Sequence, residues 1–301
     1  MSKYLISVVG PTAIGKTSLS IKLANYFNTE IISADSRQFY KEMQIGTAAP
    51  TKEELNQATH HFIHHKSIED NYNVGSFEKD AISLLNTLFK THNIVIMVGG
   101  SGLYTDAITK GLDYFPEVEP SIRISLNEQL ASEGIKVLQE QLKKLDELSY
   151  NSIAIDNPHR VIRALEIYIG TGQPYSSFLN KEKNNRNFKT ITIGISADRE
   201  IIYNRINERV DLMMDIGLLN EVSSLKSKKH LNALNTVGYK ELFKYLDKDW
   251  DLKFSVSEIK KNTRRFAKRQ MTWFRKNPSI QWFDYNYNLN DITDYINKKS
   301  N

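Results

Sequence analysis

Residues 4–17 read Tyr-Leu-Ile-Ser-Val-Val-Gly-Pro-Thr-Ala-Ile-Gly-Lys-Thr, and this stretch decides the fold. Residues 5–9 are a short apolar run rich in β-branched side chains, which predicts a buried strand. Residues 17–27 carry apolar side chains at helical spacing. Between them lies the phosphate-loop pattern G-x-x-x-x-G-K-[ST], formed by Gly10, Pro11, Thr12, Ala13, Ile14, Gly15, Lys16 and Thr17.

The segments that follow continue this pattern. Residues 30–34 and 93–98 are predicted buried strands, residues 77–89 an amphipathic helix, and residues 190–195 a strand that rejoins the sheet. Buried strands that alternate with helices indicate a parallel sheet covered on both faces. We therefore expect an α/β fold with a P-loop NTPase-like core.

The region after residue 112 has a different character. Its helical patterns are interrupted by Pro116, Pro120, Pro158 and Pro174. We predict a mostly helical insertion domain over residues 113–189. Residues 1–112 and 190–301 then form the catalytic core, whose part after Arg199 is largely helical.

Composition excludes several classes of protein. A chain of 301 residues favours about two domains. It has no cysteine, which excludes disulfides, thiolate metal sites and a cysteine nucleophile. No apolar stretch approaches the ~18 residues of a membrane span, and no signal peptide is evident, so we expect a cytoplasmic protein without a membrane partner. The net charge of +5 is weak evidence for a polyanionic partner.

The phosphate loop predicts a phosphorylated ligand with Mg²⁺. Its glycines let consecutive N–H groups face one anion, and the following helix adds its positive end. Lys16 is placed for a terminal phosphate, and the Thr17 hydroxyl for Mg²⁺. No N-K-x-D signature is present, which argues against a GTPase. A kinase, an ATPase and a transferase acting on a diphosphate all remain open.

Two further segments follow strands at the same sheet edge. Asp35 comes after the second strand, where ligands of open α/β sheets bind. It is placed to bind Mg²⁺ through water or to accept a proton, and capping the next turn is the alternative. Residues 99–104 form a glycine-rich turn with the Ser101 hydroxyl, for which a plain βα connection is the alternative.

Taken together, the motifs resemble the tRNA dimethylallyltransferase family. They are, in order, Gly-Pro-Thr-Ala-x-Gly-Lys-Thr, Asp-Ser-Arg-Gln-x-Tyr, Ile-Gly-Thr-Ala, Gly-Gly-Ser-Gly-Leu-Tyr, residues 159–166, residues 205–213, residues 237–241 and residues 261–275. The resemblance spans roughly residues 4–283. A phosphate loop is shared by many unrelated enzymes, but this combination is not.

The resemblance implies a reaction and roles for its residues. The dimethylallyl group passes from dimethylallyl diphosphate to N6 of adenine 37 of tRNA, and Mg²⁺ is required. The phosphate loop then holds the donor's diphosphate rather than ATP. By the family's pattern the catalytic residues are Asp35 as the base, Thr12, and Arg209 as the cation from outside the loop. From the residues alone, Arg209 is instead a surface residue paired with Glu208 or Asp211.

The tRNA anticodon stem-loop is the implied macromolecular partner. The stretch 260–276 is basic, contains no acidic residue and includes aromatic side chains, so it suits an RNA backbone, and a solvated face is the alternative. Arg160 and Arg163 share a helix face, with pairing to Glu166 as their alternative. The expected tRNA contacts are Asp35, Ser36, Arg37, Gln38, Ser101, Arg123, His159, Arg160, Val161, Ile162, Arg163, Gly238, Lys240, Arg264, Arg265, Lys268 and Arg269.

Some features depart from the family or stay unassigned. Ala49 stands where the family typically has lysine, and His159 where glutamine is common. No C-terminal Cys/His zinc finger is present. We interpret His60, His61, His64 and His65 as locally packed or close to RNA rather than as metal ligands. Two other functions remain: a small-molecule phosphotransferase, and a nucleotide-dependent RNA-binding protein without catalysis. We expect a monomer.

Overall fold

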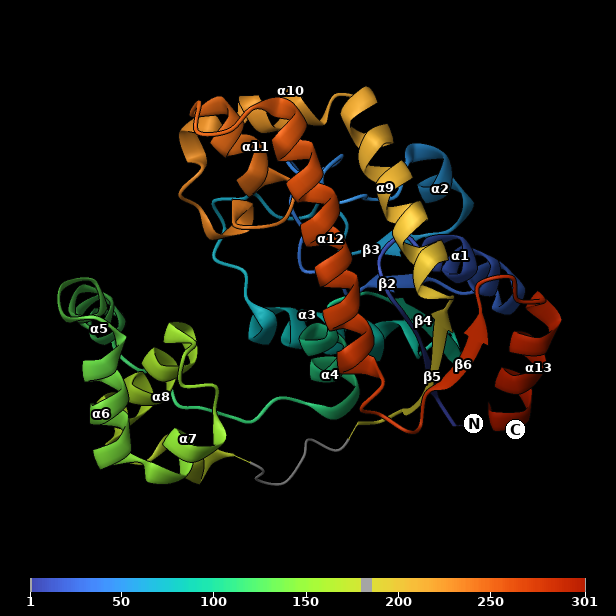
Figure 1. Cartoon of the computed structure of the whole chain (residues 1–301). Helices are drawn as coiled ribbons and strands as arrows, with labels where there is room; N and C mark the ends of the chain where they lie inside the picture. The colour runs from blue at the N-terminus through green and yellow to red at the C-terminus, as the bar shows by residue number, and fades with distance from the viewer. Residues whose placement is uncertain (1, 180–185, 301) are drawn as a thin grey trace. The chain divides into compact units, whose positions relative to one another are not determined.

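The computed structural model describes residues 2–179 and 186–300. Within these residues, six parallel strands form one sheet in the order β3-β2-β4-β1-β5-β6 (Figure 1). All six residues of β1 are buried, because neighbours pair with both of its edges and helices cover both of its faces. The strands are β1 (Tyr4–Val9), β2 (Ile31–Ser33), β3 (His60–His61), β4 (Ile94–Val98), β5 (Lys189–Ser196) and β6 (Gln281–Asp284).

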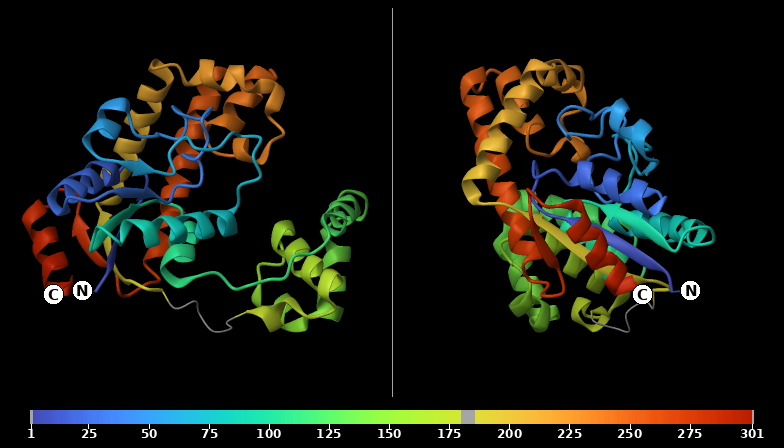
Figure 2. Two further views of the ribbon diagram at one scale, coloured as in Figure 1. Left: turned by 180° about the vertical axis from the view of Figure 1, so that it is seen from behind. Right: turned by 90° about the vertical axis from the view of Figure 1, so that its right-hand side faces the viewer.

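Alternate residues of β1 belong to two separate cores, one on each face of the sheet. Figure 2 shows the helices that flank the sheet from two further directions. Ile6 and Val8 pack with α1 (Lys16–Phe27) and α13 (Leu289–Ser300) on one face of the sheet. Leu5 packs with α3 (Val74–Leu88) and α4 (Gly102–Lys110) on the other face. The predicted α/β fold is confirmed.

A third core joins the helices of the C-terminal part. Val210, Val222, Tyr239 and Ile259 pack together with Met43, which comes from the region after β2. Figure 1 shows α9 and α12 side by side in this part. Its helices are α9 (Arg199–Asp215), α10 (Leu218–Ser224), α11 (Tyr239–Leu246) and α12 (Leu252–Phe274).

Residues Gly111–Asn185 make a separate compact unit, and the rest of the chain forms the other. The separate unit holds α5 (Pro120–Glu133), α6 (Ile135–Leu145), α7 (Glu147–Ser152) and α8 (Pro158–Thr171) around its own apolar core. We expected it to reach residue 189, but residues 186–189 belong to the core unit. Arg186 donates to the carbonyl groups of Ala107 and Ile108, and Lys189 begins β5.

Several elements differ from the prediction. The helix expected at residue 77 begins at Val74, because Asn73 caps it by accepting from the N–H groups of Gly75 and Ser76. β3, β6, α2 (Lys52–Gln57) and α13 were not predicted individually. No helix among the described residues has the length and apolar character needed to cross a membrane.

Candidate active site

The phosphate loop leaves β1 through a conformation that few side chains tolerate. Gly10 has φ 147°, and a Cβ there would overlap the carbonyl oxygen of Ile195 on β5. Ala13 has φ 65° and Gly15 has φ 103°, immediately before α1 begins at Lys16. The strand–loop–helix sequence therefore points the N-terminus of α1 at whatever the loop binds.

A cavity of about 670 Å³ opens beside this loop, at the carboxyl ends of β1, β2 and β4. Residues from three distant segments line it together: Lys16 and Thr17 from the loop, Asp35 after β2, and Arg209 on α9. Thr12 lines it as well. The structure thus brings together the five residues that were expected to carry out chemistry.

Two cations, Lys16 and Arg209, interact with each other in the cavity. Burial, and secondarily the nearby Arg209, lowers the pKa of Lys16 to about 7, although Asp35 opposes the shift. Burial, and then Arg205, also lowers the pKa of Arg209. Cations that lose hydration without gaining a counter-ion favour an anionic ligand.

Arg209 is not the surface residue of the alternative interpretation. Asp211, one of its proposed partners, pairs with Lys260 at 2.6 Å instead. The other, Glu208, is exposed and makes no ion pair among the described residues. Arg209 itself is half-buried and lines the cavity.

The oxygen atoms present suit Mg²⁺. The Thr17 hydroxyl lines the cavity and makes no hydrogen bond within residues 2–179 and 186–300. Asp35 Oδ1 accepts the N–H of Arg37 at 3.0 Å, which is the turn-capping alternative, while Oδ2 makes no hydrogen bond in the same residues. Hydroxyl and carboxylate oxygens are ligands that Mg²⁺ takes together with water and phosphate oxygens.

Two residues that sequence reasoning did not select hold the loop in place. Gln270 of α12 is 5% exposed; its Oε1 accepts the Thr12 N–H at 2.9 Å, and its Nε2 donates to Gly100 O at 2.9 Å. Arg205 donates from Nε to Ala13 O at 2.8 Å. The sequence offered one signal for each residue. Gln270 is an uncharged amide within a basic helix, and Arg205 lies one helical turn before Arg209.

The residues expected to meet tRNA beside β2 have mixed surroundings. Ser36 and Ser101 lie together, with their hydroxyl oxygens 3.3 Å apart. Arg37 donates to Asn232 O and Ala233 O, each at 3.1 Å, so its guanidinium already binds the protein's own backbone. Gln38 donates to the carbonyl groups of residues 47 and 48. Gly238, the N-cap of α11, is buried at φ 96°, and Lys240 on α11 is exposed.

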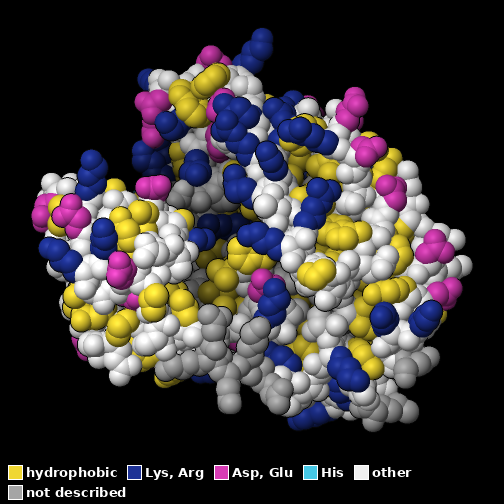
Figure 3. Space-filling model, turned by 60° about the horizontal axis from the view of Figure 1, so that its bottom comes forward, with side chains coloured by type: hydrophobic (Ala, Val, Ile, Leu, Met, Phe, Trp, Pro, Cys, Tyr) yellow, Lys and Arg dark blue, Asp and Glu magenta, His cyan; other side chains and the backbone are white. Residues whose placement is uncertain are grey.

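The basic stretch lies on α12. Figure 3 shows Lys and Arg side chains gathered on one face of the core unit. Arg264 donates to Asn207 on α9 at 2.7 Å, and Arg265 donates weakly to Asn262 at 3.4 Å. Lys268 and Arg269 are exposed and form no ion pair with any described residue. The solvated-face alternative therefore still describes these two residues when no RNA is bound.

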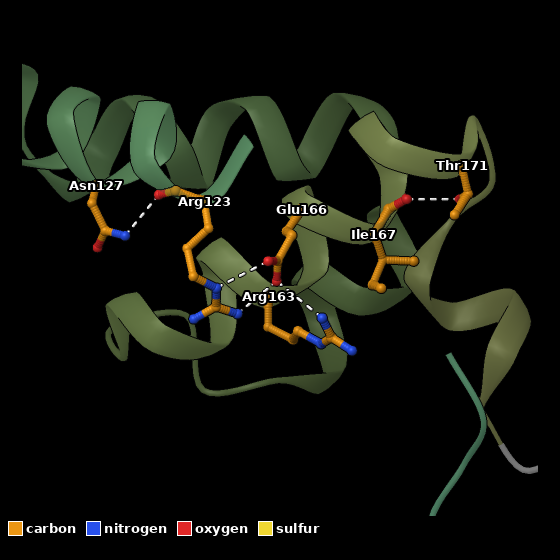
Figure 4. A network of polar contacts seen from close by, with 6 residues as sticks. All are labelled: Arg123, Asn127, Arg163, Glu166, Ile167 and Thr171. Carbon is orange, nitrogen blue, oxygen red and sulfur yellow. Dashed lines mark hydrogen bonds and ion pairs between the residues drawn. The ribbon is translucent and has the colours of Figure 1, made fainter. Parts of the chain in front are cut away.

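In the helical unit, the ion-pair alternative holds for two arginines (Figure 4). Arg123 and Arg163 both donate to the buried Glu166 carboxylate, at 2.6–2.9 Å and 3.0 Å. Burial alone would raise the pKa of Glu166, but these hydrogen bonds outweigh it and lower the pKa. His159 and Arg160 are exposed at the start of α8. Val161 and Ile162 are buried in the unit's core, so their side chains are not available to RNA.

The four histidines of the cluster are half-buried, and His60 lines the cavity. His65 lies edge-on to the rings of Phe39, Phe62 and Tyr72, and burial lowers its pKa to about 4. His61 Nε2 lies 2.5 Å from Glu30. No group of three His, Cys, Asp or Glu residues in the described part of the chain is arranged to hold a metal ion.

A profile of the IPP transferase family matches residues 38–277. The chain belongs to this family. The tRNA dimethylallyltransferase of Christiangramia forsetii is 63% identical to it over 301 residues, with 100% of both chains covered. The predicted family is therefore confirmed.

Solved structures of IPP transferases share the fold. The tRNA isopentenylpyrophosphate transferase of Bacillus halodurans is 35% identical with a TM-score of 0.74, covering 100% of this chain and 97% of that one. A eukaryotic dimethylallyltransferase acting on tRNA is 27% identical with a TM-score of 0.81, covering 94% of this chain and 74% of that one.

Proposed function

We propose that this IPP transferase family member transfers a dimethylallyl group from dimethylallyl diphosphate to N6 of adenine 37 in tRNA. One observation carries the proposal: a single cavity holds a phosphate loop, a carboxylate and an additional arginine. An allylic diphosphate needs an anion cradle for its leaving group, and an amine nucleophile needs a base. The name of the 63%-identical relative supports the same reaction.

The residues would divide the chemistry between the two reactants. The C1–O bond of the donor breaks, and its electron pair leaves with the diphosphate. Lys16, Arg209, Thr12 and the loop N–H groups neutralise the charge that builds there. The N6 lone pair forms the new C1–N6 bond, and Asp35 accepts the proton that N6 loses.

Mg²⁺ would be held by the Thr17 hydroxyl, and Asp35, which lines the same cavity, would contribute through water. When bound, the ion supplies further neutralisation of the diphosphate.

The nucleotide must leave its stack to present N6. Ser36 and Ser101, which are half-buried next to each other, and the exposed Lys268 and Arg269 of α12 would hold the surrounding RNA. We also propose that the enzyme is monomeric and cytoplasmic.

The deciding experiment incubates the protein with total tRNA, Mg²⁺ and dimethylallyl diphosphate, followed by nucleoside mass spectrometry. We expect adenosine to gain one C5H8 unit, and to gain nothing when ATP replaces the donor. ATP consumption with a small-molecule acceptor and unmodified tRNA would instead establish a phosphotransferase. Tight tRNA binding without any mass change would establish a non-catalytic RNA-binding protein.

The role of Asp35 has its own variant. Asp35→Asn keeps the shape but removes the base, so single-turnover transfer should slow by about 10²–10⁴-fold, while the Kd for inorganic diphosphate stays within about threefold. Asp198→Asn is the matched control, because Asp198 is exposed before α9 and its side chain does not cap the helix. An Asp35→Asn protein with the wild-type rate would remove the base from the proposal.

A further inference from the structure

The carboxylate of Glu221 on α10 accepts four hydrogen bonds. Oε2 accepts the N–H groups of Gln44 at 2.9 Å and Ile45 at 2.7 Å. Oε1 accepts the Gly46 N–H at 3.0 Å and the Tyr239 hydroxyl at 2.5 Å. Three consecutive backbone amides that face one carboxylate form an anion nest within the protein. Glu221 thus fixes the backbone of residues 44–46.

Tyr239 closes this arrangement from α11. Its side chain is fully buried, and burial, followed by Glu221, raises its pKa, so the hydroxyl remains a donor. A Cβ at Gly46 would overlap the Tyr239 ring, so the segment sits directly against that ring. Residues 44–46, α10 and α11 are therefore held to one another.

The same segment continues as a wall of the donor cavity. Ile45, Ala48 and Ala49 line the cavity, and Ala48 has φ 49°. Gln38 holds this wall from the sheet side, because its Nε2 donates to Thr47 O at 3.3 Å and Ala48 O at 3.1 Å. Glu221 holds it from the helical side. Two side chains therefore anchor the wall from opposite directions.

A second apolar wall comes from the end of α9 and from Ile216, which follows it and leads into α10. Leu212, Met213 and Ile216 line the cavity there, and Leu212 and Ile216 are each 58% exposed. An apolar hydrocarbon chain whose diphosphate sits in the phosphate loop would lie between these two walls. Glu221 connects the wall of residues 44–49 to α10, the helix that follows α9.

We propose that Glu221 is a positioning residue that sets the spacing of these two walls, and with it the length of prenyl chain that the cavity accepts. This inference rests on the proposed function for the prenyl donor. The mechanical part, that Glu221 tethers residues 44–46, rests on the hydrogen bonds alone.

Glu221→Gln tests the proposal. Glutamine keeps the volume but offers one oxygen and two N–H donors in place of two oxygens, so two of the four donors lose their acceptor. Amide hydrogen exchange of residues 44–49 should become at least tenfold faster. The ratio of kcat/KM for the ten-carbon geranyl diphosphate to that for dimethylallyl diphosphate should rise at least tenfold, and the KM for dimethylallyl diphosphate should rise more than kcat falls.

Two further variants complete the test. Tyr239→Phe removes one of the four hydrogen bonds to Glu221. The changes in exchange rate and in the kcat/KM ratio should therefore have the same direction as in Glu221→Gln but be smaller. This variant carries the test if Glu221→Gln does not fold. Glu208→Gln, on the exposed side of α9, is the control and should change neither readout.

The readouts separate the possible failures. Unchanged exchange in both Glu221→Gln and Tyr239→Phe would overturn the tether. Faster exchange in residues 44–49 with an unchanged ratio of kcat/KM between the two prenyl donors would overturn the specificity role. An equal fall in kcat/KM for both prenyl donors, with faster exchange throughout the chain, would overturn it as well. If the wild-type protein transfers neither donor, the proposed function and the specificity role fail together, and exchange still decides the tether.

Discussion

Lys16 is the residue whose protonation should govern anion binding. Its pKa of about 7 in the ligand-free protein means that a bound diphosphate must restore the missing proton above this pH. At pH 8, diphosphate binding should therefore take up close to one proton, and affinity should weaken about tenfold per pH unit above pH ~7. Isothermal titration calorimetry in two buffers of different ionisation enthalpy measures this uptake.

Lys16→Arg isolates the effect, since arginine stays charged throughout this range. The affinity of the Lys16→Arg protein for diphosphate should change with pH only through the ionisation of diphosphate itself. Equal proton uptake by the wild-type and Lys16→Arg proteins would show that Lys16 is already charged in the free cavity.

At the scale of the element, some basic residues of α12 contact the rest of the protein, and we expect others to contact RNA. Arg264 donates a hydrogen bond to Asn207 on α9, whereas Lys268 and Arg269 form no ion pair within the described residues, and Arg269 lies over the Phe266 ring. Lys268→Ala and Arg269→Ala should each reduce the slope of log K against log salt for tRNA binding by about one. Lys253→Ala, at the exposed N-terminal end of the same helix, should leave the slope unchanged. Slopes from filter binding at several salt concentrations would contradict this assignment if all three variants matched the wild type.

At the scale of the whole molecule, the two units should respond differently to the donor. Every residue that lines the cavity belongs to the unit formed by residues Met1–Lys110 and Arg186–Asn301. Saturation with inorganic diphosphate and Mg²⁺ at about 100 times Kd should stabilise that unit by ~2.7 kcal/mol. Hydrogen exchange should slow around residues 10–17 and in β1, and stay unchanged in α5–α8. Equal protection of both units would show that they unfold together.

The sequence alone determined the central strands, the phosphate loop and the helical character of the insertion. These features are local: a strand of apolar β-branched residues, a glycine-rich motif and a helical period each lie within about 15 consecutive residues. It did not reveal β3, which has two residues, or β6, which has four, because segments this short carry little periodicity. Family resemblance, rather than periodicity, placed Arg209 at the site.

Only the tertiary structure decided what holds the site together. Gln270 accepts from Thr12 across 258 residues, and Glu221 binds residues 44–46 across more than 170. It also decided that Arg123 and Arg163 pair with Glu166, while Lys268 and Arg269 form no ion pair with any described residue. A lone glutamine, glutamate or arginine has the same local sequence whether it faces solvent or a distant backbone. The difference arises only when the packed cores bring those backbones within hydrogen-bonding distance.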